Sequence, residues 1–509
     1  MKWLRNLFWL CCAGWLVVCC TKDPVQPERE PLRLDTLMRI EYVGLDKVNI
    51  TSALLSVGGS GLAYGHVWSL TNPLPTLADT KIEQTTVPAS LPFSFTSTLS
   101  FLMLNKTYYV RPYARTTDET AYGPVRTVQL RSTFGQFLVR ALEDSLRDRN
   151  IGYGVLVFDK GILAASGHGG LRSRTMDPEG EKPFDLNTKL HVASMSKTLT
   201  ALAFLRLAAE KGIRTTDRIL PFLPPNWTKG PNMERVTFGE LLTHRSGLIG
   251  LGDNCLNGAF AENIYNGLQK LVAKGVRVGD RGNYCYQNAN FGLFRVLIPA
   301  LMGYQFTGNE ANDDSRTQQM YANYLQQNIF EKAGQSRIQT SFPAGNPTYT
   351  YDFPYSGVAG WNPGNFDNTV GGYGWYMTPM EAGQFFADVF GTKQETVLPN
   401  AYKDTLLTNR LGTFRTLSAA TGTAAYYHDG LWRIQSPGYR GLRTLWMHFS
   451  DGTTVVLFVN ALNGANGQFP SLSNTDIVPY VLRGYDRARL AAGVRRAAPN
   501  WIIEHPEPH

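Results

Sequence analysis

The feature that most constrains the fold of this chain is a long apolar segment that opens with a serine and a lysine three residues apart. Residues 191–212 read HVASMSKTLTALAFLRLAAEKG, and Ser194 and Lys197 stand near the start. Apolar residues fall on nearly every side of the helical projection, which is typical of a buried helix. Gly212 is the expected C-terminal stop. Because positions three apart share a helix face, Ser194 and Lys197 are predicted to point the same way from the first turn.

This spacing suits a nucleophile and its base. A serine hydroxyl attacks only when a neighbouring group takes its proton. A lysine can take it where burial or a second cation keeps the amine neutral, because its free pKa is about 10.4. The helix start adds backbone N–H groups that favour a developing negative charge. Ser-x-x-Lys alone arises by chance roughly once or twice in a chain of this length, so the hypothesis needs further parts of a site.

The first twenty residues, 1–20, have the pattern of a targeting signal. Lys2 and Arg5 precede an apolar stretch that is too short to span a bilayer. Cys19 and Cys20 follow at once, and the sequence LVVCC resembles the cleavage box of bacterial lipoproteins. We therefore predict a lipoprotein signal peptide with Cys20, or Cys19, as the lipidated residue. The alternative is an ordinary signal peptide that contains cysteines.

A linker is predicted directly after this signal. Residues 21–35 (TKDPVQPEREPLRLD) lack apolar periodicity and carry prolines and charges. With a lipid at its head, such a segment would tether the protein to a membrane without spanning it. The mature protein is therefore expected in the bacterial cell envelope, facing the periplasm or the cell surface.

The charge pattern does not favour nucleic acid as a partner. Net charge is +8, yet the basic residues are scattered. The densest run lies near the C-terminus, at Arg483, Arg487, Arg489, Arg495 and Arg496. Such a run is most often a solvated helix and tail, so we do not expect nucleic-acid binding. Zinc-type Cys/His spacing and the G-x-x-x-x-G-K-[ST] phosphate loop are missing from the sequence, so no metal or cofactor is predicted.

Two cysteines, Cys255 and Cys285, lie beyond the predicted signal. An oxidising compartment permits a disulfide between them, which would close a loop of about thirty residues. From sequence alone, a pair of free thiols is an equally open alternative.

Residues 36–131 carry short strand-like runs broken by Gly, Asn, Pro and Asp. The clearest is 108–115, in which side chains alternate with the period of a half-buried strand. Several such strands at short spacing predict a small all-β sandwich. The runs GHVWS at 65–69, YYVR at 108–111 and AYG at 121–123 resemble a fibronectin type III-like module of bacterial envelope proteins. That resemblance implies a fold and says little about function.

Residues 134–490 mix helices and strands in blocks, and residues 491–509 are predicted to be a tail. The predicted elements are a helix at 134–149, a strand pair at 152–170, the helix at 191–212, helices at 290–302 and 318–330, and a strand pair at 444–460. Blocks without strict βα alternation predict an α+β domain rather than a parallel sheet.

A second proton-transfer group is sought among tyrosines with an asparagine two residues on. Tyr321 and Asn323 lie inside an amphipathic pattern and are predicted to be ordinary helix surface. Tyr286 and Asn288 follow a turn-like Gly-Asn pair and precede a helix. A tyrosine on such a loop can reach a pocket, and the amide can bond a substrate carbonyl. Taken by itself, Tyr286 would more often be a structural aromatic.

The chain has no K-[ST]-G triplet but two H-x-G triplets, which start at His168 and His428. The second lies downstream of Tyr286 and ahead of the final strand pair. A strand with a glycine at Gly430 would let a substrate backbone lie against it and would present an N–H to an oxyanion. His428 would titrate near neutrality there. The plainer alternative for His428 is a half-buried strand histidine.

Five motifs occur in a recognisable order, namely Ser194-x-x-Lys197, LLTHRSGL at 241–248, Tyr286-x-Asn288, Gly371-Gly372 before Thr378, and His428-x-Gly430. In that order they resemble the serine β-lactamase and penicillin-binding-protein superfamily, and within it the class C β-lactamases, D-aminopeptidases and related esterases. The resemblance covers 134–490. It implies an α+β, β-lactamase/transpeptidase-like fold, with an antiparallel sheet flanked by helices and a helical subdomain. The LLTHRSGL stretch is implied as structural, and His244 is not expected to be catalytic.

The resemblance also assigns roles. It implies that Ser194 forms an acyl-enzyme and that Lys197 and Tyr286 share the proton transfers, with Tyr286 also activating water. Which of the two is the base stays open. Asn288 would hold the substrate amide or carbonyl. Backbone N–H groups of Ser194 and Leu431 would form the oxyanion hole.

One departure from the family pattern bears on the substrate. His428 and Gly430 stand where β-lactamases have Lys-Thr-Gly, whose lysine helps to hold the β-lactam carboxylate. A neutral His428 would bind carboxylates weakly, which shifts the expectation toward small esters, amides or D-amino-acid peptides. The alternatives are a penicillin-binding or DD-peptidase protein that acts on cell-wall peptides, and a retired hydrolase that binds a glycan or peptide.

Overall fold

The chain folds into two compact units. The computed structural model describes residues 30–43, 47–255, 260–335, 338–392, 394–435 and 438–494. The first unit runs to Ser100 and resumes at Lys106–Gln129; the second comprises Phe101–Asn105 and the chain from Leu130. The predicted signal with Cys19 and Cys20, and most of the predicted tail, lie outside the described residues. Within the described ranges, every helix is too short or too polar to cross a bilayer.

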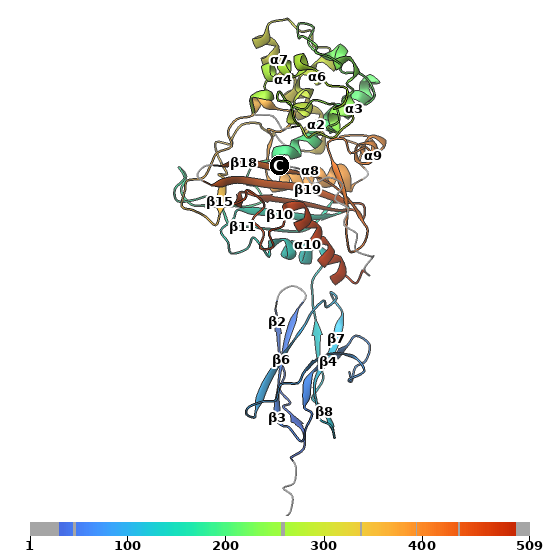
Figure 1. The fold of residues 1–509 in the computed structure, drawn as a ribbon, viewed down its shortest axis with the longest axis vertical. Helices are drawn as coiled ribbons and strands as arrows, with labels where there is room; N and C mark the ends of the chain where they lie inside the picture. Colours follow the sequence, from blue (N-terminus) through green and yellow to red (C-terminus); the bar gives the residue numbers. More distant parts are fainter. Residues whose placement is uncertain are drawn as a thin grey trace, which may run out of the picture. The chain divides into compact units, whose positions relative to one another are not determined.

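The first unit is a sandwich of two antiparallel sheets (Figure 1). In one sheet β3 (Val48–Ser56) is paired with three other strands, β1 (Arg33–Leu34), β2 (Arg39–Tyr42) and β6 (Phe93–Leu99). The other sheet centres on β7: β4 (Ala63–Ser69), β5 (Thr80–Gln84), β7 (Thr107–Arg115), β8 (Thr120–Tyr122) and β9 (Arg126–Gln129). Leu54 and Phe95 from the first sheet meet Tyr64 and Ala114 from the second in a buried core. The predicted all-β sandwich is confirmed.

The edges of this unit differ from the prediction. Strand β1 lies inside the stretch 21–35 that was expected to be a linker, and Leu32 there is buried, with its N–H donating to Glu119 at 2.7 Å. Alternating leucines among charged residues were the signal, but two residues are too few to show a period. Strand β5 carries mostly exposed, polar side chains, so it lacks the apolar alternation that marks a half-buried strand.

The second unit is built on an antiparallel sheet with helices on both faces (Figure 1). Its main strands, in spatial order, are β11 (Ile162–Gly169), β10 (Tyr153–Asp159), β20 (Thr453–Val459), β19 (Tyr439–Phe449), β18 (Ala424–Gln435) and β17 (Phe414–Leu417). A short strand, β15 (Tyr351–Phe353), pairs antiparallel with β19 and parallel with β21 (Ala461–Asn463). The strand pairs predicted at 152–170 and 444–460 are confirmed.

The central strands are buried because helices cover them from both sides. On β10, the Tyr153 hydroxyl reaches Glu143 of α1 (Phe134–Glu143) at 3.1 Å. A Cβ on the next residue, Gly154, would meet Pro379 of α8 (Pro379–Gly391) at 2.6 Å. Successive residues of a strand face opposite ways, so α1 and α8 cover opposite faces. Helix α10 (Ile477–Ala491) packs beside α1 (Figure 1).

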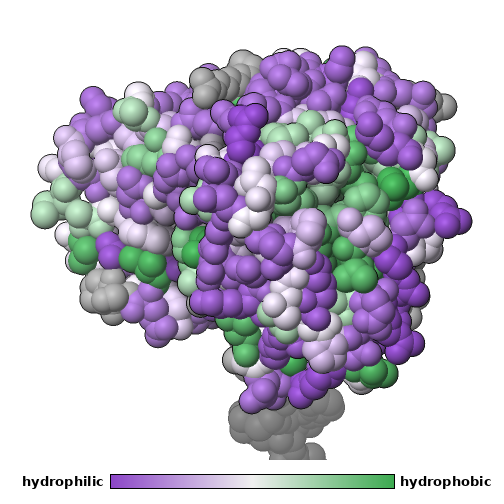
Figure 2. Space-filling view, turned by 90° about the horizontal axis from the view of Figure 1, so that it is seen from above, coloured by the Kyte–Doolittle hydropathy of each residue, from purple (hydrophilic) through white to green (hydrophobic). Residues whose placement is uncertain are grey.

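A helical part lies between two segments of this sheet domain (Figure 1). Its helices are α2 (Ser196–Lys211), α3 (Phe238–Leu242), α4 (Tyr265–Lys274), α5 (Asn288–Gly292), α6 (Phe294–Leu301) and α7 (Glu310–Leu325). The helix α2 is buried along most of its length and ends at Gly212, which has a left-handed φ of 68°, as predicted. Polar side chains cover most of the face shown in Figure 2, with apolar ones gathered in patches between them.

Several helix boundaries depart from the sequence prediction. The helix expected at 134–149 ends at Glu143. The one expected at 290–302 is two helices that meet at Leu293. The one expected at 318–330 begins at Glu310, because the Asn309 side chain caps its N-terminus by accepting from the Asn312 N–H at 3.1 Å. Polar first turns carry no apolar period, so the pattern located the helix interiors better than their ends.

Cys255 and Cys285 are joined by a disulfide, with their Cα atoms 5.8 Å apart. Cys285 is buried directly ahead of Tyr286, whereas Cys255 is exposed. The bond therefore ties the loop that carries Tyr286 to a surface segment thirty residues earlier.

Replacing both cysteines with serine should lower the free energy of unfolding of the second unit by about 3 to 4 kcal/mol, because a closed loop of this length restricts the unfolded chain. Urea denaturation with and without reductant measures this. The native protein in reductant should approach the double variant, and a native protein indifferent to reductant would contradict the expectation.

Candidate active site

Ser194 stands at the entry to the buried helix. It lies in a short 3-10 turn, η1 (Ala193–Met195), that runs directly into α2, so it precedes the α-helix instead of occupying its first turn as predicted. Ala193 has a left-handed φ of 47°, a conformation that costs a non-glycine residue about 1–3 kcal/mol and that recurs at functional sites. The turn keeps the three-residue spacing useful, because Lys197 Nζ still lies 2.9 Å from Ser194 Oγ.

Lys197 is fully buried and is held by oxygens from three segments. Its Nζ lies 2.9 Å from Ser194 Oγ, and it donates to Asn288 Oδ1 at 2.7 Å and to the Gly372 carbonyl at 2.9 Å. Asn288 opens α5. A Cβ on Gly372 would come within 2.8 Å of the Asn288 carbonyl. Because glycine has no Cβ, the Gly372 backbone can lie close to Asn288 and its own carbonyl can reach the lysine.

Tyr286 reaches Ser194 from the loop that directly precedes α5. Its hydroxyl donates to Ser194 Oγ at 2.8 Å, and its ring centroid lies 4.7 Å from Lys197 Nζ. The His244 ring packs on the Tyr286 ring with centroids 4.4 Å apart. The His244 carbonyl accepts from the Cys285 N–H at 2.8 Å, and its Nδ1 accepts from the Gln287 N–H at 3.2 Å. The LLTHRSGL stretch thus supports the tyrosine loop from behind.

His244 is a neutral support. Burial lowers its pKa well below the ordinary value near 6.5, and any positive charge on the neighbouring Lys197 or His428 lowers it further. Its Nδ1 is the acceptor of the Gln287 N–H, so the ring proton lies on Nε2.

Strand β18 forms another side of the site around Ser194. Gly430 packs against the serine turn: a Cβ there would come within 2.5 Å of the Val192 carbonyl and 2.4 Å of Thr444 Oγ1. Thr444 Oγ1 donates to the same Val192 carbonyl at 2.9 Å. Leu431 follows on the strand, beside the turn that carries Ser194.

His428 is buried on the same strand, at 1% exposure. Its Nδ1 donates to the Asp429 carbonyl at 2.7 Å, because a carbonyl can only accept. Nδ1 therefore carries a proton, and the neutral form of the ring would have its lone pair on Nε2. Beneath it, the buried Asp429 carboxylate pairs with Arg443 at 2.9 Å, which ties β18 to β19.

A family model described as Beta-lactamase matches residues 139–470, more than half of the chain. The chain belongs to the β-lactamase family. Members of this family are serine hydrolases that form acyl-enzymes.

Relatives of this β-lactamase-family chain are distant. PbpX of Bacillus subtilis (strain 168), which bears the name of a penicillin-binding protein, is 26% identical over 147 residues, or 29% of this chain and 32% of PbpX. The match thus spans about a third of that relative. The octameric penicillin-binding protein homologue from Pyrococcus abyssi has a TM-score of 0.51 at 17% identity, over 71% of this chain and 77% of that one. FmtA from Staphylococcus aureus has 0.51 at 16%, over 71% and 91%. The predicted α+β, transpeptidase-like fold is confirmed.

Tyr321 and His168, which belong to the other copies of the Tyr-x-Asn and H-x-G patterns, have different surroundings from the predicted site residues. Tyr321 was predicted to lie on a helix surface, but it is fully buried, and its hydroxyl bonds Thr200 Oγ1 of α2 at 2.7 Å. His168, from the other H-x-G triplet, lies on β11 with its Nδ1 3.2 Å from the Phe184 carbonyl, in a separate pocket. The Gly372 carbonyl was missed as a lysine partner, because a backbone acceptor leaves no mark on residue type.

Gly430→Ala should impair the β-lactamase-type site, because the new methyl group would collide with the Val192 carbonyl and displace the serine turn. We expect the rate at which a fluorophosphonate labels Ser194 to fall by about 100-fold, roughly the effect of misplacing a reacting group by an ångström. Gly279→Ala is the matched control, since a Cβ there meets open space. Equal labelling of Gly430→Ala and the control would contradict this account of the glycine.

His191 supports the serine turn from the other side. It lies on β14 (Leu190–His191), which pairs with β16 (Tyr376–Met377). The ring is fully buried and stacks on Phe366 with centroids 4.1 Å apart. Neither ring nitrogen has a hydrogen-bond partner among the described residues. Burial lowers its pKa to about 3.

This shift predicts acid sensitivity. Below pH 6.5 the unfolded histidine takes up a proton that the folded one refuses, so stability is lost as pH falls, by about 2 kcal/mol between pH 7 and pH 5 for this residue. His191→Phe should reduce the difference in free energy of unfolding between those pH values by that amount, measured by urea denaturation. An unchanged difference would mean that the folded ring is already charged.

Proposed function

We propose that this protein is a serine hydrolase that acts through an acyl-enzyme at Ser194 on a small ester, an amide or a D-amino-acid-containing peptide. The observation that carries the proposal is the meeting of Lys197 Nζ and the Tyr286 hydroxyl on one serine oxygen, at 2.9 and 2.8 Å. Both groups can move protons, and a serine needs such a neighbour to attack a carbonyl.

The lysine contacts suit a base. Lys197 donates two N–H bonds to carbonyl oxygens, at Asn288 Oδ1 and Gly372. A neutral amine has two N–H groups and one lone pair, so in that state its lone pair faces the Ser194 hydroxyl. Full burial favours the neutral form. The Tyr286 hydroxyl lies at nearly the same distance from Ser194 Oγ. The labelling rates of the Lys197 and Tyr286 variants therefore distinguish which of the two residues is the base.

The reaction would run in two halves. Ser194 Oγ bonds to the substrate carbonyl carbon as its proton passes to Lys197 or Tyr286; the bond to the leaving group then breaks, and the leaving group takes that proton. Water next bonds to the acyl carbon and gives a proton to the same base; the bond to Ser194 Oγ then breaks, and Oγ takes that proton as the acid is released. N–H groups of Ser194 and Leu431 would hold the oxyanion, worth about 2.7–4 kcal/mol per donor. The Asn288 Nδ2 group would hold the substrate carbonyl.

The surroundings of this activity are proposed from sequence. Cys20, or Cys19, would carry the lipid, which would place the enzyme in a bacterial cell envelope on a tether. The N-terminal sandwich would be a fibronectin type III-like spacer. Substrates reaching such an enzyme would be small molecules or peptides outside the cytoplasm.

A DD-peptidase that acts on cell-wall peptides is a second form of the same chemistry. The observation that favours it is the stretch shared with PbpX, which is named as a penicillin-binding protein. A penicillin adduct on Ser194 that persists for minutes would support this form, whereas rapid release of hydrolysed penicillin would point to a β-lactamase.

The full chain treated with a fluorophosphonate should gain one adduct by intact mass, and Ser194→Ala should gain none. Lys197→Met removes the amine and should slow labelling at least 1,000-fold; Tyr286→Phe should slow it about 10- to 100-fold if the tyrosine only assists. The reverse order would make Tyr286 the base. A folded protein without any adduct would leave a binding protein as the better account.

A further inference from the structure

The Gly371-Gly372 segment, whose second carbonyl holds Lys197, is itself held by a hydroxyl that the mechanism above does not use. Thr200 Oγ1 donates to the Gly371 carbonyl at 2.6 Å, and Lys197 Nζ donates to the Gly372 carbonyl at 2.9 Å. Both side chains come from α2, three residues apart, so they share one face of the helix. One helix face therefore holds two successive carbonyls of this segment.

The direction of the Thr200 hydrogen bonds follows from its neighbours. Thr200 is fully buried, and three oxygens lie within reach of its Oγ1. They are the Gly371 carbonyl at 2.6 Å, the Tyr321 hydroxyl at 2.7 Å and the Ser196 carbonyl at 3.2 Å. Carbonyl oxygens only accept, so the single Thr200 proton goes to a carbonyl, chiefly to the closer one at Gly371. The Tyr321 hydroxyl is then the donor to Thr200 Oγ1.

Tyr321 is suited to remain a donor. It lies on α7 and is fully buried. Burial raises its pKa above the ordinary value near 10, so the phenol keeps its proton at physiological pH. A hydroxyl that accepts one hydrogen bond donates a stronger one, because hydrogen bonds in a chain polarise one another. Tyr321 therefore strengthens the bond from Thr200 to Gly371.

The glycine segment needs such bonds from outside. Gly371 has a φ of 115°, which L side chains rarely adopt, and a Cβ there would come within 2.5 Å of the Phe291 carbonyl. Glycine is therefore required at this position, and it has no side chain that packing could hold in place. The two carbonyls belong to adjacent peptide groups. If the first group turned, the Gly372 carbonyl would move away from Lys197 Nζ.

We propose that Thr200 is a positioning residue for the reaction, whose hydroxyl holds the glycine segment so that the Gly372 carbonyl stays on Lys197. Tyr321 supports Thr200 in this role. The inference rests on the proposed function, because it concerns how the lysine is presented to the nucleophile. Thr200 acts through the lysine and not on the substrate.

The Gly372 carbonyl matters because it limits how the lysine amine can rotate. A neutral amine has two N–H groups and one lone pair. While Asn288 Oδ1 and the Gly372 carbonyl take the two N–H groups, the lone pair faces Ser194 Oγ. If one acceptor is lost, the amine can rotate about its Cε–Nζ bond and turn an N–H toward the serine. The base would then be present but wrongly oriented.

Thr200→Val tests the proposal, because it removes the hydroxyl at nearly the same size. We expect the fluorophosphonate to label this variant about 10- to 100-fold more slowly than the full chain, since a reacting group is misplaced. Thr200→Ser restores the hydroxyl and should label within about threefold of the full chain. Tyr321→Phe keeps the bond from Thr200 to Gly371 and should slow labelling by about three- to tenfold. Urea denaturation checks that each variant is folded.

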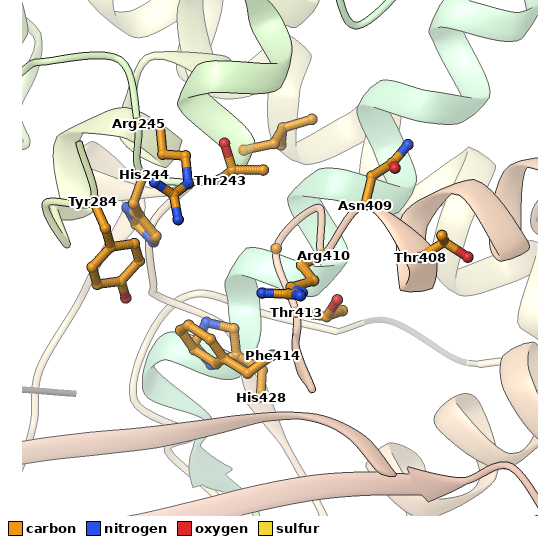
Figure 3. Close-up of a pocket in the computed structure, with 12 residues that line it drawn as sticks. Thr243, His244, Arg245, Tyr284, Thr408, Asn409, Arg410, Thr413, Phe414 and His428 are labelled. Carbon is orange, nitrogen blue, oxygen red and sulfur yellow. The ribbon is translucent and has the colours of Figure 1, made fainter. Parts of the chain in front are cut away.

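Thr198→Val is the matched control. Thr198 is fully buried on the same helix, and its hydroxyl donates to the Gly412 carbonyl at 2.7 Å, in the segment that carries Arg410 and Thr413 in Figure 3. This variant also loses a buried hydrogen bond of α2, but it should label within about threefold of the full chain. Equal slowing of Thr198→Val and Thr200→Val would show general damage to the helix and would overturn the inference.

The pH dependence of labelling is a second readout, which a merely structural role would not move. On the acid side, labelling falls as the base beside Ser194 takes up a proton. A carbonyl oxygen stabilises an ammonium group more than a neutral amine. Displacing the Gly372 carbonyl should therefore move the midpoint of this fall to lower pH in Thr200→Val and leave it in place in Thr198→Val. A Thr200→Val variant that labels slowly with an unmoved midpoint would also overturn the inference.

Labelling of the full chain keeps the two proposals apart. If the full chain is labelled and Thr200→Val is labelled equally fast, the positioning role fails and the hydrolase proposal stands. If Ser194 of the full chain is not labelled, the hydrolase proposal fails and the positioning role fails with it.

Discussion

The site depends on one buried nitrogen, Lys197 Nζ, and on the three oxygens that surround it. A lysine with no exposed surface must have its hydrogen-bonding capacity met by the protein, because water cannot reach it. The oxygens come from the serine turn, the start of α5 and the Gly371-Gly372 segment, which are far apart in sequence. Bringing them to one atom fixes how the helical part meets the sheet domain. The nucleophile is therefore a product of the packing around the lysine.

This arrangement requires backbone segments from different parts of the chain to lie very close to each other. Gly372 and Gly430 lie where a methyl group would strike a carbonyl of a neighbouring segment. Three non-glycine residues with left-handed φ, namely Ala193, His244 and Arg410, surround the same region. Strain of this kind persists only where the surrounding contacts determine it, and here those contacts belong to α2 and to the segments that pack on it. Glycines in close contact and strained residues thus gather around the nucleophile, as they also do elsewhere in the second unit.

The sequence predicted the features that depend on the local pattern of residues. It missed those that depend on how segments far apart in the sequence pack against each other. The period of apolar residues was enough for α2 and for the hairpins of the sheet, and the resemblance to a known family supplied the set of motif residues now found around Ser194. They could not reveal the 3-10 turn at Ala193, because a left-handed alanine is chosen by its surroundings. Tyr321 was misjudged for the same reason: its neighbours look amphipathic, yet α7 turns that face onto α2. Arg410 and Thr413 belong to no motif, and only the fold brings them beside His244.

The contacts of strand β18 change how its histidine should be understood. From sequence, His428 looked like the loss of a permanent cation from the strand beside the nucleophile. In the fold its Nδ1 donates to the Asp429 carbonyl, so this nitrogen carries a proton whether the ring is neutral or charged. Arg410 and Arg245 line a pocket together with His428, and both guanidinium groups keep their charge at every physiological pH. A cation lost from a strand can thus be compensated from a loop, because an electrostatic site is defined by where charges lie and not by which element carries them.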